Sequence, residues 1–267
     1  MLRDFPSRVF ESKFDKTLKK IPALGKLFSS FFGLFEFYIL ETFRKLDNIF
    51  SIYTMGFINK YLLRGRWGGR VVPLNKNISI DVKFIPSQEI LEILHRSKVV
   101  GIGECYCRAV QRKHENDNCD HPLHTCIHFG PGKSLYEIPF KSTNLKRVSK
   151  KEINQLLDVC DERGLLHQLI YFPNPQFYYI VCNCCPCCCV VLSKFLEKGS
   201  PQMIKSDFIT ETDDTKCVHC GNCIKECHFK ARYIRNSLLK FDSTRCFGCG
   251  LCVSKCPHQA IELIKKE

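Results

Sequence analysis

Residues 27–62 are rich in aromatic side chains but contain no uncharged run long enough to cross a membrane. The longest uncharged windows in this region are 27–35 and 48–59, whereas a spanning helix needs about 20 apolar residues. The opening sequence, MLRDFPSRVFESK, also lacks the apolar stretch of a signal peptide behind its charges. We therefore expect a cytoplasmic protein, either free or peripheral on the inner face of the membrane.

Motifs for nucleotides and nucleic acids are also missing. The nearest candidate loop, Gly101-Ile102-Gly103-Glu104, lacks the rest of a G-x-G-x-x-G pattern. The chain has 40 Lys and Arg against 27 Asp and Glu, a net charge of +13, and most of this excess precedes residue 206. Without a nucleic-acid motif, the excess positive charge favours an acidic protein partner, anionic lipid or a negatively charged cofactor.

Cysteine, in contrast, is abundant, with 19 residues in a chain of 267. Disulfide frameworks belong mainly to small secreted domains that cannot build a core of their own. This chain is long enough for a core, and its hydrophobic content of 45% is that of an ordinary globular protein. Metal ligation in a reducing compartment is therefore the better interpretation of the cysteines.

Two copies of C-x2-C-x2-C-x3-C lie near the C-terminus, CVHCGNCIKEC at 217–227 and CFGCGLCVSKC at 246–256. Residues 206–267 thus resemble a two-cluster bacterial ferredoxin, in which the last cysteine of each run binds the other run's cluster. The resemblance implies two [4Fe-4S] clusters. The first would be bound by Cys217, Cys220, Cys223 and Cys256, and the second by Cys246, Cys249, Cys252 and Cys227.

A pair of zinc knuckles is the alternative for these motifs, but zinc has no use for the third and fourth cysteines at these offsets. Gly221, Gly248 and Gly250 stand where the loops must bring backbone N–H groups close to sulfur. The first run ends Cys227-His228 where Cys-Pro is usual. We still expect Cys227 to be a ligand, but this departure leaves open whether the two clusters have equal potentials. Because low-potential clusters are oxygen-sensitive, we also expect an anaerobic host.

The middle of the chain alternates short strands and helices. We expect strands at 78–84 and 98–103, a helix at 87–96, a polar loop at 111–134, and a hairpin of 165–172 with 177–181 around a turn at 173–175. A capping box, Ser149 to Glu152, opens another helix, and Gly164 closes it. The predicted fold class is α+β, with an amphipathic helical segment at 1–66, a cysteine-rich α/β-type domain at 67–205, a hinge at 198–201 and the ferredoxin domain at 206–267.

A second cysteine group centres on CNCCPCCC at 182–189. Read in steps of three, it contains Cys182, Cys185 and Cys188, with a second pair at Cys184 and Cys187. Neighbouring cysteines cannot all point one way, so we expect partners among Cys105, Cys107, Cys119 and Cys126. We predict one or two further iron–sulfur centres on a subset of these cysteines. The ten candidates are Cys105, Cys107, Cys119, Cys126, Cys182, Cys184, Cys185, Cys187, Cys188 and Cys189.

Two other uses of this second group remain open. One is a zinc site that ties the loop to the hairpin, and the other is a redox thiol or disulfide device. The histidines at 121, 124 and 128 could bind metal, donate hydrogen bonds to sulfur or relay protons, or they are surface residues. Cys160 lies on the apolar side of its helix and is interpreted as a small core residue.

Aromatic and aliphatic residues recur at steps of three and four through residues 27–62 and form one apolar stripe along a helix or helix pair. This stripe would pack on the protein's own core, lie on a membrane surface, or contact a partner subunit.

Residues 67–256 also resemble an uncharacterised group of 4Fe-4S dicluster-domain proteins of anaerobic bacteria and archaea. The resemblance rests on VVPLNKNI at 71–78, ECYCR at 104–108, CIHFG at 126–130, CNCCPCCC and the paired ferredoxin runs. It implies the cofactor type rather than a reaction.

Three functions are therefore considered. The first is an electron-transfer protein or subunit that works with redox partner proteins. The second is a reductase with a catalytic iron–sulfur site in the cysteine-rich domain, where Glu104, Arg108 and the loop histidines would handle substrate or protons. The third is a scaffold that hands clusters or electrons to a larger complex. No catalytic residue is assigned from the sequence.

Overall fold

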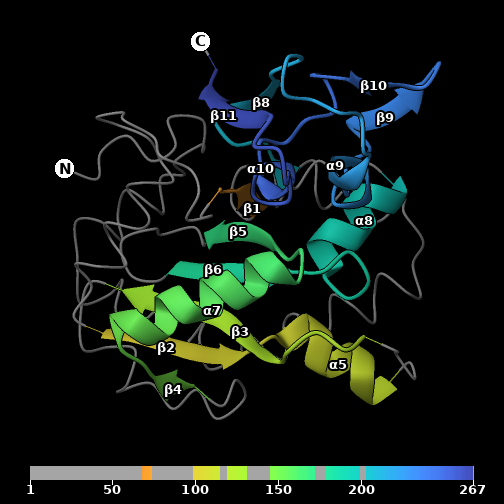
Figure 1. The fold of residues 1–267 in the computed structure, drawn as a ribbon. Coiled ribbons are helices and arrows are strands. Elements are labelled where there is room, and N and C mark those ends of the chain that lie inside the picture. Colours follow the sequence, from red (N-terminus) through yellow and green to blue (C-terminus); the bar gives the residue numbers. More distant parts are fainter. Residues whose placement is uncertain are drawn as a thin grey trace, which may run out of the picture.

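The computed structural model describes residues 68–73, 99–114, 119–130, 145–171, 179–198 and 203–266. These residues form a seven-stranded sheet with three helices and, at the C-terminal end, a smaller part with two two-stranded sheets (Figure 1). None of the helices within these ranges is long and apolar enough to cross a membrane. The segment 1–66, the strand expected at 78–84, the helix at 87–96, the turn at 173–175 and residues 199–201 of the hinge lie outside the described residues.

The large sheet has the strand order β4-β2-β3-β6-β5-β1-β7. Its neighbours pair antiparallel, except that β7 runs parallel to β1. Helices and a mainly antiparallel sheet place the chain in the α+β class. The strands are β1 (Gly68–Val71), β2 (Val99–Glu104), β3 (His124–Gly130), β4 (Lys146–Arg147), β5 (Leu166–Tyr171), β6 (Tyr179–Cys184) and β7 (Met203–Ile204).

The stretch 111–134 is not the polar loop expected from its composition. It contains the end of helix α5 (Tyr106–His114) and all of β3. Ile127 on β3 lies opposite Ile102 of β2 and Val181 of β6, and it is completely buried. The strand was not predicted because the stretch around Ile127 is rich in polar residues. It is stabilised by pairing with β2 on one side and β6 on the other.

Helix α7 (Lys150–Glu162) covers one face of the sheet and confirms the expected capping box. The Ser149 hydroxyl accepts a hydrogen bond from the Glu152 backbone N–H, and the Glu152 carboxylate accepts one from the Ser149 N–H. Gly164 follows the helix in the left-handed conformation. The apolar face of α7 packs on the sheet core, which consists of Val72, Val100, Ile127, Ile153, Leu157, Leu169 and Val181.

The C-terminal part is built from two similar halves, 29 residues apart along the chain (Cys217 to Cys246). Each half begins with an Asp-x-Thr turn whose carboxylate accepts a backbone N–H at 2.9 Å. Each has a left-handed glycine before a short helix. The elements are β8 (Phe208–Thr212), α9 (Asn222–Lys225), β9 (Arg232–Arg235), β10 (Leu238–Phe241), α10 (Leu251–Ser254) and β11 (Ile261–Lys265), with β8 paired to β11 and β9 to β10.

The two parts of the chain pack directly against each other. Phe195 of helix α8 (Val190–Lys198) contacts Phe247 with ring centroids 4.8 Å apart, and Phe247 stacks on Phe229 at 4.1 Å. At the end of α7, His228 Nε2 lies 2.9 Å from the Gly164 carbonyl oxygen. The histidine that replaces the usual proline therefore belongs to the contact between the two parts.

Candidate metal centres

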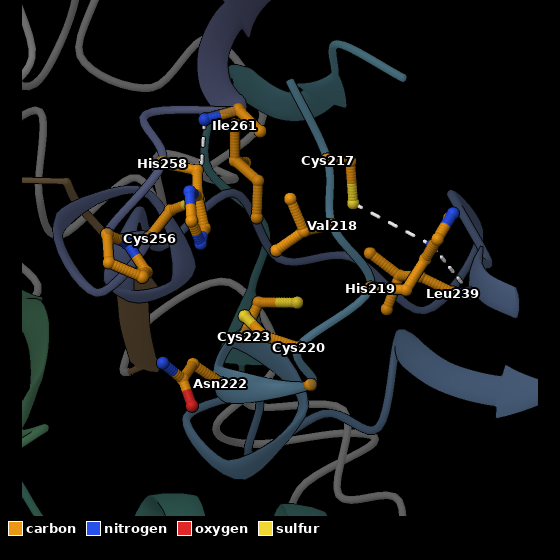
Figure 2. Close-up of a pocket in the computed structure, with 13 residues that line it drawn as sticks. Cys217, Val218, His219, Cys220, Asn222, Cys223, Leu239, Cys256, His258 and Ile261 are labelled. Carbon is orange, nitrogen blue, oxygen red and sulfur yellow. Dashed lines mark hydrogen bonds between the residues drawn. The ribbon is translucent and has the colours of Figure 1, made fainter. Parts of the chain in front are cut away.

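The cysteines assigned to the first ferredoxin cluster surround one cavity (Figure 2). Cys217 and Cys220 lie in the loop before α9, Cys223 lies in α9 itself, and Cys256 follows α10 on the facing loop. The cavity has an empty volume of about 310 Å³, part of which is open to solvent. Cys223 is buried and Cys220 is exposed. Four thiols around one open-sided cavity are the donor set that a [4Fe-4S] cluster requires.

The four cysteines assigned to the second cluster lie deeper in the protein. Cys246 and Cys252 are buried, whereas Cys227 and Cys249 are partly buried. Backbone N–H groups donate to the sulfurs, from Gly248 to Cys246 at 3.4 Å and from Ala231 to Cys227 at 3.2 Å. Such N–H groups stabilise thiolates bound to iron. The residues present therefore fit the cluster that the motif implies.

Gly248 shows why this loop demands glycine. Its φ is +63°, and a Cβ atom there would lie 2.2 Å from the Phe208 carbonyl oxygen and the Ser206 hydroxyl. Any side chain would therefore push the loop away from β8 and withdraw the N–H group that faces Cys246. The sequence-based interpretation of this glycine is confirmed by the geometry.

Arg232 links the two groups of ferredoxin cysteines, and sequence reasoning missed it. Its side chain is buried, donates to the hydroxyls of Thr210 and Thr212 at 2.8 Å each, and acts electrostatically on Cys223 of the first group and Cys252 of the second. Burial raises the pKa of Cys252 to about 11, and the Arg232 cation opposes that rise. No local signal distinguishes this arginine from the exposed Arg235 on the same strand.

Six cysteines of the middle part form a closed ring of sulfur contacts, in which each thiol interacts with two others. The members come from the start of α5, from β3, from β6 and from the turn before α8. We call this set the six-thiol ring. In order around the ring, its members are Cys105, Cys126, Cys182, Cys184, Cys189 and Cys107.

The ring is largely closed to solvent, because four of its members are buried and the other two are partly buried. Contacts with Cys107 and Cys126 lower the pKa of Cys105, and the nearby Arg108 cation adds to this, although burial acts in the opposite direction. The same contact with Cys105 raises the pKa of Cys107 and of Cys126. The contacts within the ring thus favour one deprotonated thiol hydrogen-bonded by protonated neighbours.

The remaining four candidate cysteines form a separate, more compact group. Their sulfur atoms all lie within 4.8 Å of one another. Cys185 and Cys188 are buried, Cys119 is partly buried and Cys187 is exposed. We call this set, Cys119, Cys185, Cys187 and Cys188, the four-thiol group.

The expected pairing of CNCCPCCC with the upstream cysteines is confirmed, but not the grouping in steps of three. Cys182 lies in the six-thiol ring, whereas Cys185 and Cys188 lie in the four-thiol group. The reason is a change of backbone conformation. Cys182 and Cys184 share one face of β6, which ends at residue 184. Cys185, Cys187 and Cys188 follow the end of the strand and lie with Cys119 instead.

Arg108 stands between the ring and the four-thiol group. Its buried guanidinium donates to the Pro122 carbonyl, to Thr125 Oγ1 at 3.1 Å, to the Asn183 carbonyl at 3.2 Å and to Cys185 Sγ at 3.5 Å. Burial acts to lower its pKa, but nearby cysteine sulfurs, Cys105 foremost, outweigh this and raise it. Both Nη atoms of the side chain are thus engaged by the protein.

The loop histidines lie in different surroundings. His124 Nε2 lies 3.6 Å from a Glu104 carboxylate oxygen near the surface. His128 lies buried in β3, where burial lowers its pKa to about 4 and keeps the ring neutral. Cys160 is fully buried, as expected, and packs against Cys185 and Cys188. Burial raises the pKa of Cys160 to about 12, so it stays a neutral thiol.

Comparison with known proteins supports the C-terminal assignment. No curated protein matches the chain. Residues 239–262, which include Cys246, Cys249, Cys252 and Cys256, match the 4Fe-4S binding domain family. The chain therefore carries a 4Fe-4S binding domain near its C-terminus, with at least one such cluster, and this match supports an iron–sulfur electron-transfer role.

Proposed function

We propose that the protein is an iron–sulfur electron carrier, or the electron-transfer subunit of a larger oxidoreductase. It would hold two [4Fe-4S] clusters in the C-terminal part and a further iron–sulfur centre on the six-thiol ring. Such clusters change charge by one electron, at potentials set by burial and by hydrogen bonds to sulfur.

One observation carries this proposal: the ring and the second ferredoxin group border the same apolar cluster. Cys184 and Cys189 of the ring are buried in it beside Phe247, and Cys227 and Cys249 of the ferredoxin part pack against it. The two sets of ligands thus contact one continuous group of buried apolar side chains. A packed protein medium keeps reorganisation small when the charge of a metal centre changes, which suits electron transfer between them.

The first ferredoxin group supplies the side open to a partner. Val218, which lines its cavity, is 58% exposed, and Cys220 is also exposed. We propose that a redox partner protein contacts this edge. The apolar stripe at 27–62 is proposed as the attachment to a membrane surface or a partner subunit.

The burial and hydrogen bonding of Arg108 favour an electron carrier over a reductase. The reductase hypothesis offers this guanidinium as one of the groups that would handle substrate or protons, but it is buried and has four hydrogen-bond partners. Of the other groups in that hypothesis, Glu104 and His124 pair with each other.

The test is to purify the full chain without oxygen and count iron and acid-labile sulfide. We expect about twelve of each per chain, because two cubanes and a third cluster of that size need this number. The Cys184→Ser variant is expected to fall to about eight while keeping the EPR signals of the reduced ferredoxin clusters.

The matched control is Cys160→Ala, which removes a buried thiol outside the ring and should leave the iron count unchanged. About eight irons in the wild-type protein would limit the clusters to the ferredoxin part and refute the third centre. Zinc in place of iron at residues 217–256 would refute the electron-transfer role altogether.

A further inference from the structure

We propose that the four-thiol group binds one tetrahedral metal ion, of the zinc type, and not an iron–sulfur cluster. This site is separate from those in the proposed electron-transfer function. It would clamp the loop that carries Cys119 to the turn that carries Cys185, Cys187 and Cys188.

The distances between the sulfur atoms carry the proposal. With metal–sulfur bonds of about 2.3 Å, a tetrahedral ion places its ligand sulfurs about 3.8 Å apart. In the structure, Cys119 and Cys185 are 3.9 Å apart and Cys187 and Cys188 are 3.6 Å apart. All four sulfurs lie within 4.8 Å of one another. The group is already contracted to the size of a single ion.

The ferredoxin cysteines provide an internal comparison. In a cubane each thiolate binds a different iron, so the sulfurs must surround the whole cluster. Cys217, Cys220, Cys223 and Cys256 accordingly line a cavity. Within the described ranges, the four-thiol group is the one set of candidate ligands in which three or more donor atoms are mutually within 4.8 Å. The same fold therefore spaces its thiols in two different ways.

The sequence of the turn fits the same chemistry. Cys185-Pro186-Cys187-Cys188 contains a C-x2-C pair, the usual knuckle of a zinc site, and a third thiol lies between its ends. The Cys189 N–H donates to the Cys185 carbonyl at 3.2 Å and keeps the turn tight. The fourth sulfur comes from 66 residues away along the chain. Four sulfur ligands leave no open position, which is typical of a structural rather than a catalytic ion.

Two arginines support the proposed site: Arg112 holds the loop that carries Cys119, and Arg108 offsets the negative charge of the thiolates. Arg112 donates to the Cys119 carbonyl at 2.6 Å and to the His121 carbonyl at 2.5 Å. These hydrogen bonds fix the backbone of the loop that carries Cys119. Four thiolates around a divalent ion carry a net charge of about −2. The buried Arg108 cation donates directly to Cys185 Sγ at 3.5 Å and offsets part of it. A buried cation beside sulfur stabilises the deprotonated ligand set.

The experiment measures zinc, iron and sulfide in the full chain and in two variants, all purified without oxygen. We expect one zinc ion per wild-type chain in addition to the iron. The Cys185→Ser/Cys188→Ser double variant should lose that zinc and keep its iron and sulfide. Cys160→Ala, which alters a thiol packed against the same two residues, should keep all three.

Each other outcome has a defined meaning. Loss of one iron without sulfide would support a single-ion site whose metal is iron. Loss of about four irons with equal sulfide would show a cubane and overturn the proposal. An unchanged metal content would show that these thiols are not ligands.

If the double variant does not fold, the wild-type protein still decides the question. Substitution with Co²⁺ should give the visible bands of a tetrahedral cobalt–thiolate complex, and their absence would overturn the proposal. Failure of the electron-transfer function would appear separately, as missing iron and sulfide in the wild-type chain.

Discussion

At the scale of single residues, two buried arginines are the least expected components of the candidate sites. Arg232 acts on both groups of ferredoxin cysteines, and Arg108 acts on the six-thiol ring and the four-thiol group. Thiolate-bound metal centres carry net negative charge, and a fixed cation in a medium of low dielectric offsets it strongly. Each arginine therefore lies where it would stabilise two of the proposed metal centres.

Replacement of Arg232 by leucine is expected to lower the midpoint potentials of the ferredoxin clusters. Removing a nearby positive charge disfavours the reduced, more negative state, and at an effective dielectric of about 20 the shift is on the order of 50 mV. A redox titration monitored by EPR measures this. Arg235→Leu removes an exposed charge from the same strand and should leave the potentials within about 10 mV, because solvent screens it. Equal shifts in both variants would contradict a specific role for Arg232.

At the scale of elements, helix α7 depends on its N-terminal cap. The reciprocal bonds between Ser149 and Glu152 satisfy backbone N–H groups that the first turn leaves without partners. These bonds also lower the pKa of the Glu152 carboxyl. Because the folded-state pKa is the lower one, this contribution to stability is complete above the ordinary pKa of 4.5 and is lost as the pH falls.

The Ser149→Ala variant should unfold about 1 kcal/mol more easily, which corresponds to a fall in melting temperature of about 3 °C. Thermal unfolding followed by circular dichroism at neutral pH measures the difference. Lys151→Ala, an exposed change in the first turn of the same helix, serves as the control and should stay within about 0.5 kcal/mol of the wild type. If the two variants melt together, the cap does not stabilise the folded protein.

At the scale of the whole molecule, the ferredoxin part packs on the sheet through one compact contact. Phe195, Phe229 and Phe247 form its apolar centre. Around it, Ser254 Oγ donates to Asp161 Oδ1 at 3.0 Å, and Lys255 donates to the Glu162 carbonyl at 2.9 Å. Polar bonds fix the orientation while aromatic burial supplies most of the free energy. This contact keeps the ring and the second ferredoxin group against the same apolar cluster.

Phe195→Ala is therefore expected to loosen the two parts without removing any ligand. Truncating a partly buried phenylalanine should cost about 2 kcal/mol, and limited proteolysis should cut between the parts several times faster. Iron and sulfide should remain at wild-type levels. Leu196→Ala changes the exposed neighbour on α8 and should leave proteolysis unchanged. A Phe195→Ala protein as resistant as wild type would show that the aromatic contact is dispensable.

The sequence by itself determined features that depend on short-range geometry. The spacing of Cys217, Cys220 and Cys223 around one cavity, the capping box of α7 and the strand expected at 98–103, observed at 99–104, all follow from neighbouring residues. The tertiary structure alone decided that β3 lies in the sheet, that Arg108 and Arg232 are buried beside thiols, and that CNCCPCCC divides between two sites. The physical reason is that these features depend on pairing and burial between segments far apart in the chain, and composition within a local window carries no information about them.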